Sequence, residues 1–273
     1  DGSVARAREL GAEVVELDMS RPFTAARARN AGFARLRELK PDLEFVQFVD
    51  GDCVLTSGWI KAGVAELSSQ TGVAIVCGRL TEMFPQRSLY NRLADIEWDS
   101  PVGNVMSCGG LFLIRAEIFA QAGGFHEDVI AGEEPELCSR LIERGWRIER
   151  LQTQMAQHDL GMTRFSQWWR RQVRAGYGGL YTFERCAGQR IRPFARQIQS
   201  ARAWSLGWPL LVAAAFATGG LVDAVRGAMV GGLVILSLLP LQVLRIAVHQ
   251  TRRHRSMRDA ATYAVLMVIA KFP

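Results

Sequence analysis

Short apolar runs alternate with helical patterns along the first 150 residues of the chain. Apolar runs bounded by turn residues predict strands at 12–17, 45–49, 73–77, 108–114 and 146–151. Apolar or small residues at helical spacing predict helices from about residue 4, with Ser3 as its N-cap, and over 23–39, 59–67, 116–122 and 133–144. This order is typical of βαβ units and predicts an α/β fold with a mostly parallel sheet and flanking helices.

Two carboxylates follow the predicted strand 45–49, at the sheet edge where open α/β folds bind ligands. Side chains at positions i and i+2 of a strand point the same way, so Asp50 and Asp52 repel each other unless a cation lies between them. A hard divalent ion that carries substrate phosphates meets this requirement. A turn with one capping and one solvated Asp explains the same residues without a ligand.

A second acidic cluster begins the predicted helix 133–144. Acids at 133, 134 and 136 suit the positive end of a helix dipole, and Pro135 suits the first turn, so helix capping alone explains them. If two of these carboxylates face a cleft, however, their mutual repulsion raises the proton affinity of one, as a general base requires.

The stretch 78–104 lacks clean periodicity and contains Trp98. Such a segment is either a connection that lines a site or a surface loop.

Positive charge is concentrated after residue 160. The net charge is +6, and one acid, Glu184, stands among nine arginines at 164, 170, 171, 174, 185, 190, 192, 196 and 202. Trp168, Trp169, Tyr177 and Tyr181 alternate with arginines over 165–183, which predicts an amphipathic helix in a membrane interface. A soluble helix packed on the domain is the alternative. The chain has no nucleic-acid motif, so we expect an anionic membrane and no nucleic acid as partner.

Apolar segments follow the basic one. Transmembrane helices are predicted at about 204–222, 227–248 and 260–273, because the first two contain no charge or almost none over about the length of a bilayer. Arginines precede the first and follow the second, which places both basic sides and the catalytic part in the cytoplasm. We therefore expect a multi-pass protein of the cytoplasmic (inner) membrane. A buried helical hairpin in a soluble protein is the alternative.

The five cysteines are scattered, with no Cys-x-x-Cys pair. This argues against a disulfide framework or a zinc site and favours a reducing compartment. Because the chain begins with Asp and ends within an apolar run, we expect both ends to be incomplete.

Several motifs occur in the order typical of one family. Asp1-Gly2-Ser3 looks like the end of an Asp-Asp-Gly-Ser turn, and residues 26–32, Ala-Arg-Ala-Arg-Asn-Ala-Gly, are similar to a helix with an Ala-Arg-Asn-x-Gly signature. Asp50-Gly51-Asp52 looks like a metal-binding Asp-x-Asp motif. Residues 132–141 resemble Gly-Glu-Asp-x-Glu-Leu-x-x-Arg-Leu. Over roughly residues 1–180 the chain thus resembles the family 2 inverting glycosyltransferases of the GT-A fold, membrane-attached bacterial members in particular.

The resemblance implies a role for each matching residue. It implies donor binding by Asp1, Arg27, Asn30, Asp50, Asp52, Gly109 and Gly110. Asp52 is the first candidate ligand for Mg²⁺ or Mn²⁺, with Asp50 and His158 as the others. Glu134 stands at the position of the family's catalytic Asp; because Glu is one methylene longer, Glu133 shares the assignment of base. The acceptor or membrane side is assigned to Trp98, Gln167, Trp168, Trp169, Arg170 and Arg171.

Two departures from the family pattern limit what it implies. Residues 167–171 match the Gln-x-x-Arg-Trp motif of processive synthases only loosely, so processive polymerisation is not implied. The first strand of the nucleotide-binding half is expected before Asp1.

The function implied is transfer of a sugar, with inversion, from a nucleotide-diphosphate sugar to the hydroxyl of a saccharide or lipid-linked acceptor, in cell-surface polysaccharide or glycolipid synthesis. We expect a GT-A catalytic domain at 1–160, a basic interfacial segment at 161–202 and transmembrane helices at 203–273. Three alternatives stay open: a polyprenyl-phosphate sugar transferase, a non-catalytic membrane-bound module that keeps the fold, and a magnesium-dependent phosphatase or nuclease that uses Asp50 and Asp52.

Overall fold

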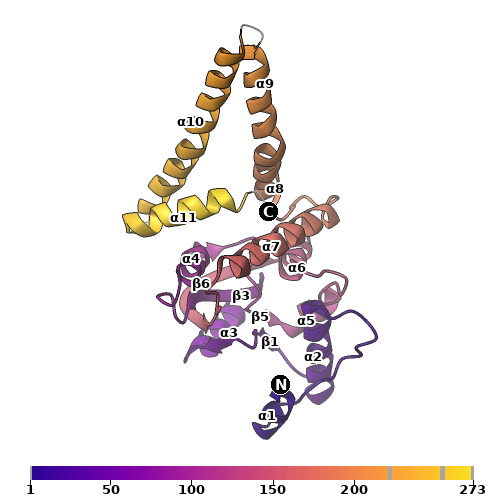
Figure 1. Cartoon of the computed structure of the whole chain (residues 1–273). Coiled ribbons are helices and arrows are strands. Elements are labelled where there is room, and N and C mark those ends of the chain that lie inside the picture. Colours follow the sequence, from indigo (N-terminus) through magenta and orange to yellow (C-terminus); the bar gives the residue numbers. More distant parts are fainter. Residues whose placement is uncertain (1, 221–222, 253–255, 272–273) are drawn as a thin grey trace. The chain divides into compact units, whose positions relative to one another are not determined.

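A computed structural model of the chain describes residues 2–220, 223–252 and 256–271, which fall into two compact units. The first contains residues 2–84, 95–161 and 177–193 and holds the sheet. The second contains residues 85–94 and 162–176 and the described residues from 194 onward, and it is helical. Each unit is therefore built from separate stretches of the chain (Figure 1).

One mixed sheet forms the centre of the first unit. Its strands lie in the order β1 (Phe45–Phe48), β5 (Phe112–Arg115), β3 (Val73–Glu82), β6 (Arg147–His158) and β2 (Cys53–Leu55), and β4 (Gly103–Asn104) pairs with β6. Within the described residues, β3 and β6 form the parallel pair, and the other pairs are antiparallel.

The expectation of a mostly parallel sheet is wrong because of the position of β5. Strand β2 and helix α3 (Trp59–Ser69) lie between β1 and β3 along the chain. Both β1 and β3 are antiparallel to β5, so they run in the same direction as a βαβ unit requires. β5 lies between them and pairs with both. The alternation of strands and helices thus predicts that β1 and β3 run in the same direction. It does not predict that the later strand β5 is inserted between them.

The remaining helices of the sheet unit are α1 (Ser3–Glu9), α2 (Ala25–Leu39), α5 (Ala116–Gln121) and α6 (Glu133–Glu143). Helix α2 begins at Thr24, whose hydroxyl accepts a hydrogen bond from the backbone N–H of Arg27 at 3.1 Å. Helix α1 begins at Gly2, which has a φ of 82° and no side chain to cap with. The expected N-cap at Ser3 is therefore wrong by one residue.

Two further expectations need correction. Residues 12–17 form no strand; among the described strands, the sheet ends at β1 on one side and β2 on the other, and no strand lies beside this segment to pair with it. The stretch 78–104 is more regular than expected, because β3 continues to Glu82 and α4 (Leu89–Trp98) follows it.

Aromatic side chains fill the core beside β1 and β5. Phe48 packs against Phe112, Phe119 and Phe125, with ring centroids 5.2, 5.0 and 5.3 Å apart. Trp59, at the start of α3, is fully buried, and its indole N–H donates to Gln47 Oε1 at 2.7 Å. This bond satisfies the one polar atom of the ring, so Trp59 fixes α3 against the strand that leads to Asp50.

Gly78 in β3 gives a test of this packing. A Cβ at this position would lie 2.5 Å from the carbonyl oxygen of Thr153 and 2.7 Å from the Trp59 ring. We expect Gly78→Ala to lower the free energy of unfolding by about 1–3 kcal/mol, measured by urea denaturation. Gly188→Ala is the matched control, because no atom lies within 4 Å of its added Cβ and it changes the unfolded chain in the same way. An equal loss in both variants would contradict the close packing around Gly78.

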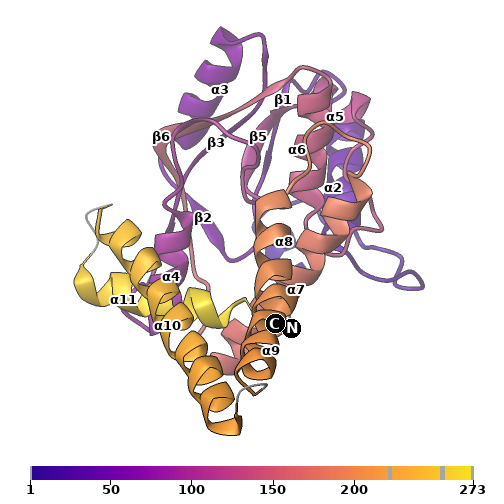
Figure 2. The same ribbon diagram turned by 90° about the horizontal axis from the view of Figure 1, so that it is seen from above.

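Helix α7 (Phe165–Arg185) confirms the helix expected at 165–183. In the second unit, α8 (Ala195–Arg202) continues through a π-helical turn, η1 (Ala203–Gly207), into α9 (Trp208–Gly220). Helix α10 (Ala224–Thr251) begins at Asp223, whose carboxylate accepts from the N–H of Arg226 at 2.7 Å. Helices α9 and α10 form a hairpin, and α11 (Met257–Ile269) runs from the foot of α10 toward α8 (Figures 1 and 2).

Among the described residues, the membrane span expected at 227–248 falls on a helix that is long enough to cross a bilayer. Val225–Thr251 is long and apolar enough to cross a membrane, judged by length and composition alone. The span expected at 204–222 is divided between η1 and α9, and its residues 221–222 lie outside the described residues. The span expected at 260–273 begins within α11, which ends at Ile269; its 13 residues rise about 20 Å, less than a bilayer core.

Candidate functional site

Asp52 and His158 are brought together by the pairing of β2 with β6. The register places Cys53 opposite His158, and the N–H of Asp159 donates to the carbonyl oxygen of Asp52 at 3.0 Å. As a result, Asp52 Oδ1 lies 3.1 Å from His158 Nε2. The ring of Trp98 packs edge-on against the His158 ring, with centroids 4.9 Å apart. Three residues selected from the sequence therefore meet at the end of β6.

The donor atoms at this point suit a hard or borderline divalent ion. Asp52 is 55% exposed, whereas His158 Nδ1 is buried and has no hydrogen-bond partner among the described residues. Cys53 could offer a third ligand atom. Burial, and then the charges of Asp52 and Asp50, raise the pKa of the Cys53 thiol to about 12. Mg²⁺ and Mn²⁺ prefer oxygen ligands to thiols, so the Asp52 carboxylate, with the His158 imidazole beside it, is the pair that would hold either ion.

Arg29 joins the two acidic clusters. Its guanidinium donates to Asp50 Oδ1 at 2.6 Å and also to Glu133 Oε1, although these acids are far apart in the sequence. Burial lowers the pKa of Arg29, but the charges and hydrogen bonds of Asp50 and then Glu133 outweigh this and raise it overall. Gly110 borders the same network, since a Cβ at this glycine would lie 3.9 Å from Asp50 Oδ2. The network fixes the β1 end, α2 and the start of α6 relative to one another.

Arg27 and Asn30, expected to bind the donor, support loops instead. The Arg27 guanidinium donates to the backbone carbonyls of Asp18, Arg21 and Pro22 at 2.6–2.9 Å. The Asn30 amide donates to the carbonyl of Phe125 at 2.8 Å and accepts from its N–H at 2.9 Å. The side chain of this helix that reaches the site is Arg29. The signal for it was present, because Arg29 precedes Asn30 in the Ala-Arg-Asn-x-Gly match.

Glu134 lies in a buried cluster rather than facing open space. It is 3% exposed, and its carboxylate accepts from the N–H groups of Cys108 at 2.6 Å and Gly109 at 3.0 Å. The thiols of Cys108 and Cys138 each lie 2.9 Å from Glu134 Oε1. Burial is the main cause that raises the pKa of Cys138 to about 12 and that of Cys108 well above its usual range, so both thiols can donate. Both oxygens of Glu134 are therefore occupied by donors of the protein itself.

The glycine pair Gly109-Gly110 forms the turn that leads into β5. Both residues have positive φ, 85° and 91°, which other residues rarely adopt. The expected strand 108–114 therefore begins only at Phe112. Because the Gly109 N–H donates to Glu134, the carboxylate holds this turn in place beside Asp50 and Arg29.

The residues assigned to the acceptor or membrane side, other than Trp98, belong to the second unit. Gln167 caps helix α7, since its side-chain oxygen accepts from the N–H groups of Thr163 and Arg164 at 2.9 Å. Trp168 is 1% exposed and stacks near Tyr90, so its expected place in the membrane interface is wrong. Trp169 packs on Phe165. Arg170 donates to the carbonyl oxygen of Ser166, and Arg171 follows it in the same helix. Asp1 lies outside the described residues.

Comparison with known proteins confirms the resemblance to glycosyltransferases. No family model matches the chain. The pre-mycofactocin glycosyltransferase of Mycobacterium tuberculosis, in strains CDC 1551 and H37Rv, is 29% identical over 167 residues, which cover 56% of this chain and 33% of the relative. The match thus spans about a third of the length of this curated relative.

The fold is also that of a solved glycosyltransferase. The mannosyltransferase PcManGT from Pyrobaculum calidifontis, solved in complex with GDP-Man and Mn²⁺, superposes with a TM-score of 0.56 at 15% identity, over 99% of this chain and 73% of PcManGT. The structure of S. aureus TarS residues 1–349 gives a TM-score of 0.44 at 13% identity, over 96% and 75% of the two chains. The superposition on PcManGT shows that its fold and the α/β fold of this chain, with its mixed sheet, are alike.

Proposed function

We propose that the chain transfers a sugar from a nucleotide-diphosphate sugar to an acceptor hydroxyl, with inversion at the anomeric carbon. Two contacts support this proposal. Asp52 lies beside His158, and Arg29 binds both Asp50 and Glu133. Such a site offers both a place for a diphosphate and a carboxylate for the acceptor. The sequence similarity to a glycosyltransferase supports the same reaction class.

A divalent ion would be held by Asp52 and His158. When bound, it supplies positive charge to the diphosphate leaving group, which gains negative charge as the sugar departs. PcManGT was solved with GDP-Man and Mn²⁺, which supports Mn²⁺ and a nucleotide sugar as probes here. Arg29 holds Asp50 beside the Gly109-Gly110 turn, so the chain itself fixes the walls of the donor site.

Glu133 is the carboxylate that we assign as general base. A base must reach the proton that it removes, and both Glu134 oxygens are occupied within a buried cluster. Glu133 is 13% exposed on its side chain and lies in the Arg29 network. In the proposed step the acceptor oxygen attacks the anomeric carbon, the bond from that carbon to the diphosphate oxygen breaks, and the hydroxyl proton passes to Glu133.

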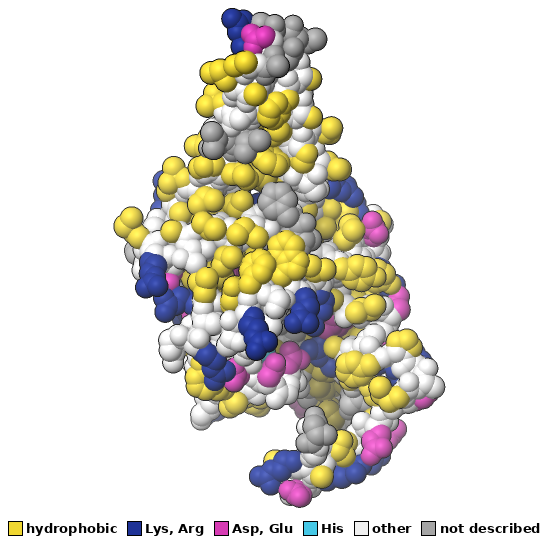
Figure 3. Space-filling model, in the orientation of Figure 1, with side chains coloured by type: hydrophobic (Ala, Val, Ile, Leu, Met, Phe, Trp, Pro, Cys, Tyr) yellow, Lys and Arg dark blue, Asp and Glu magenta, His cyan; other side chains and the backbone are white. Residues whose placement is uncertain are grey.

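The hairpin of α9 and α10 supports attachment to a membrane. Large apolar side chains are exposed along both helices, among them Leu210, Leu211, Met229 and Leu233, and Figure 3 shows apolar side chains over the face in view. Only 12% of the apolar window in α10 is buried, which is unlike the core helix of a soluble protein. We propose that this hairpin enters the cytoplasmic membrane, with the arginine-rich segment and the catalytic unit on the cytoplasmic side.

The reaction class is tested by measuring nucleoside diphosphate release. The purified chain is incubated with UDP- and GDP-sugars, with membrane lipid extract as acceptor, and with Mn²⁺, Mg²⁺ or EDTA. We expect release with at least one donor, dependent on the metal and stimulated by the acceptor. Calorimetric binding of UDP or GDP without any turnover would instead favour a binding module, and phosphate release from simple phosphate esters would favour a phosphatase.

A further inference from the structure

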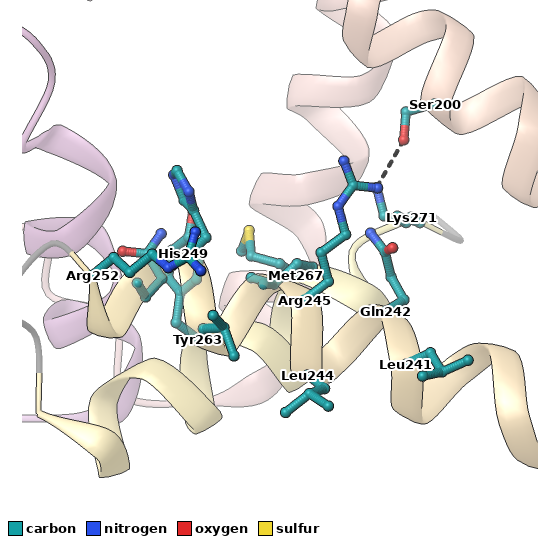
Figure 4. Close-up of a pocket in the computed structure, with 13 residues that line it drawn as sticks. Ser200, Leu241, Gln242, Leu244, Arg245, His249, Arg252, Tyr263, Met267 and Lys271 are labelled. Carbon is teal, nitrogen blue, oxygen red and sulfur yellow. Dashed lines mark hydrogen bonds between the residues drawn. The ribbon is translucent and has the colours of Figure 1, made fainter.

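The second unit contains a large pocket at the foot of the α9–α10 hairpin. Its volume is about 1090 Å³, and it is formed by the end of α8, the second half of α10, α11 and Lys271 (Figure 4). All of these elements belong to one compact unit. The pocket is therefore a feature of the helical unit alone, separate from the residues proposed for sugar transfer.

Positive charge and the absence of acids distinguish this pocket. Arg245, Arg252 and Lys271 line it together with His249, and no described lining residue is an Asp or Glu. No ion pair joins any of the three cations to a carboxylate within the described ranges 2–220, 223–252 and 256–271. A group of cations without a carboxylate is complementary to an anion, because an anion offsets their mutual repulsion.

Lys271 and Arg245 are two of the cationic residues that line the pocket. The ammonium of Lys271 donates to Ser200 Oγ at 2.9 Å, so its direction is fixed (Figure 4). Partial burial, and then the nearby charge of Arg245, lower the pKa of Lys271. Both cations line the same pocket, and Ser200 of α8 holds the Lys271 ammonium.

Gln250 shows that a hydrogen-bonding group is also buried in the wall. It is 6% exposed, and its Oε1 has no hydrogen-bond partner among the described residues. Burial of an unpaired oxygen is costly, so Gln250 marks a polar position in the wall of the pocket.

Apolar side chains border the charged part of the pocket. Leu241, Leu244 and Val248 line it from α10 and are 58%, 59% and 40% exposed. They continue the exposed apolar surface of the hairpin, which we propose to lie in the membrane. A ligand that fits the whole pocket therefore has an anionic head and a hydrocarbon tail.

We propose that this pocket binds the phosphate headgroup of an anionic lipid, with Arg245 and Lys271 on the phosphate and the hydrocarbon chain along Leu241, Leu244 and Val248. The bound lipid would fix α8, α10 and α11 against one another at the membrane surface. The proposal uses the membrane attachment suggested above but not the transfer reaction, and its test contains no sugar donor, so the two proposals can fail separately.

The test is a calorimetric titration of the full chain in micelles of an uncharged maltoside detergent. The probes are dioctanoyl phosphatidate, dioctanoyl phosphatidylcholine and inorganic phosphate. We expect phosphatidate to bind about tenfold or more tightly than the zwitterionic phosphatidylcholine, because the anion meets two cations, and inorganic phosphate to bind far more weakly than either lipid. Equal affinity for the two lipids would overturn the charged site, and inorganic phosphate that binds as tightly as phosphatidate would overturn the lipid.

Variants locate the binding. The double variant Arg245→Gln with Lys271→Gln should lose the preference for phosphatidate, whereas Arg245→Lys should keep most of it. Arg258→Gln is the matched control, because Arg258 lies in α11 of the same unit but does not line the pocket. A control variant that loses the preference as fully as the double variant would overturn the assignment. If the double variant does not fold, the comparison of the three probes on the unchanged chain still decides.

Discussion

Replacing Asp52 with Asn is expected to lower the rate of sugar transfer by about a hundredfold or more. Asp52 is the exposed carboxylate beside His158, and an amide oxygen there carries no full charge with which to hold a divalent ion. The variant should retain its fold, because the side chain is more than half exposed. The measurement is nucleoside diphosphate release over a range of Mn²⁺ concentrations, together with calorimetric titration of Mn²⁺ in the presence of nucleotide.

Asp42→Asn is the control for a change of charge alone, since Asp42 is an exposed acid just before β1 in the same unit. His158→Ala should resemble Asp52→Asn in lowering the affinity for Mn²⁺, because His158 Nε2 lies 3.1 Å from Asp52 Oδ1. If Asp52→Asn keeps its rate and its Mn²⁺ response, the ion is not held at this pair. Asp50, which is bound by Arg29, would then be the next carboxylate to test.

The sequence predicted the helices of the first unit closely and the sheet less well. The helices 23–39 and 59–67 appear as α2 and α3 with ends shifted by no more than two residues, because helical spacing and caps are local properties. The strand pairing depends on residues far apart: Phe45 lies opposite Arg115, and Val73 opposite Arg147. No local pattern specifies that β5 enters between β1 and β3, so the mixed sheet could not be derived from alternation.

The candidate site shows the same division between local and distant information. The adjacency of Asp52 and His158 follows from the register of β2 and β6, and the motif order led to both residues. The choice between Arg27 and Arg29 was not decided by the motif, since both lie in residues 26–32. Two positions along a helix are 200° apart, so the two side chains point in nearly opposite directions. Arg27 turns to the loop before α2, and Arg29 turns to Asp50 and Glu133.

Aromatic and arginine residues in α7 illustrate a second limit. The pattern over 165–183 is amphipathic, and that property is shared by a helix on a membrane and a helix packed on protein. The burial of Trp168 shows that one face of α7 packs on protein, whereas Phe165, Val173 and Tyr177 of the same helix are exposed. Further exposed apolar surface lies along α9 and α10, where the absence of charge already indicated it.

Glu133→Gln is expected to lower the transfer rate by about a hundred- to ten-thousandfold, the usual range for loss of a general base, while binding of the nucleotide persists. The amide cannot take the proton of the acceptor hydroxyl, yet its oxygen can still accept a hydrogen bond from Arg29. The measurement compares the transfer rate with calorimetric binding of UDP or GDP in the presence of Mn²⁺. A lipid phosphate acceptor is already ionised, so for a polyprenyl-phosphate sugar transferase this substitution would change the rate little.

Glu134→Gln should act on stability first. Its carboxylate accepts from two backbone N–H groups and two thiols, and an amide NH₂ placed among those donors leaves at least one of them unsatisfied. We expect a loss of about 1–3 kcal/mol in the free energy of unfolding, and a change in activity that follows from the displaced Gly109-Gly110 turn. If Glu134→Gln instead keeps full stability and binds nucleotide normally but no longer transfers sugar, Glu134 is the base, and the buried carboxylate must turn outward when the acceptor binds.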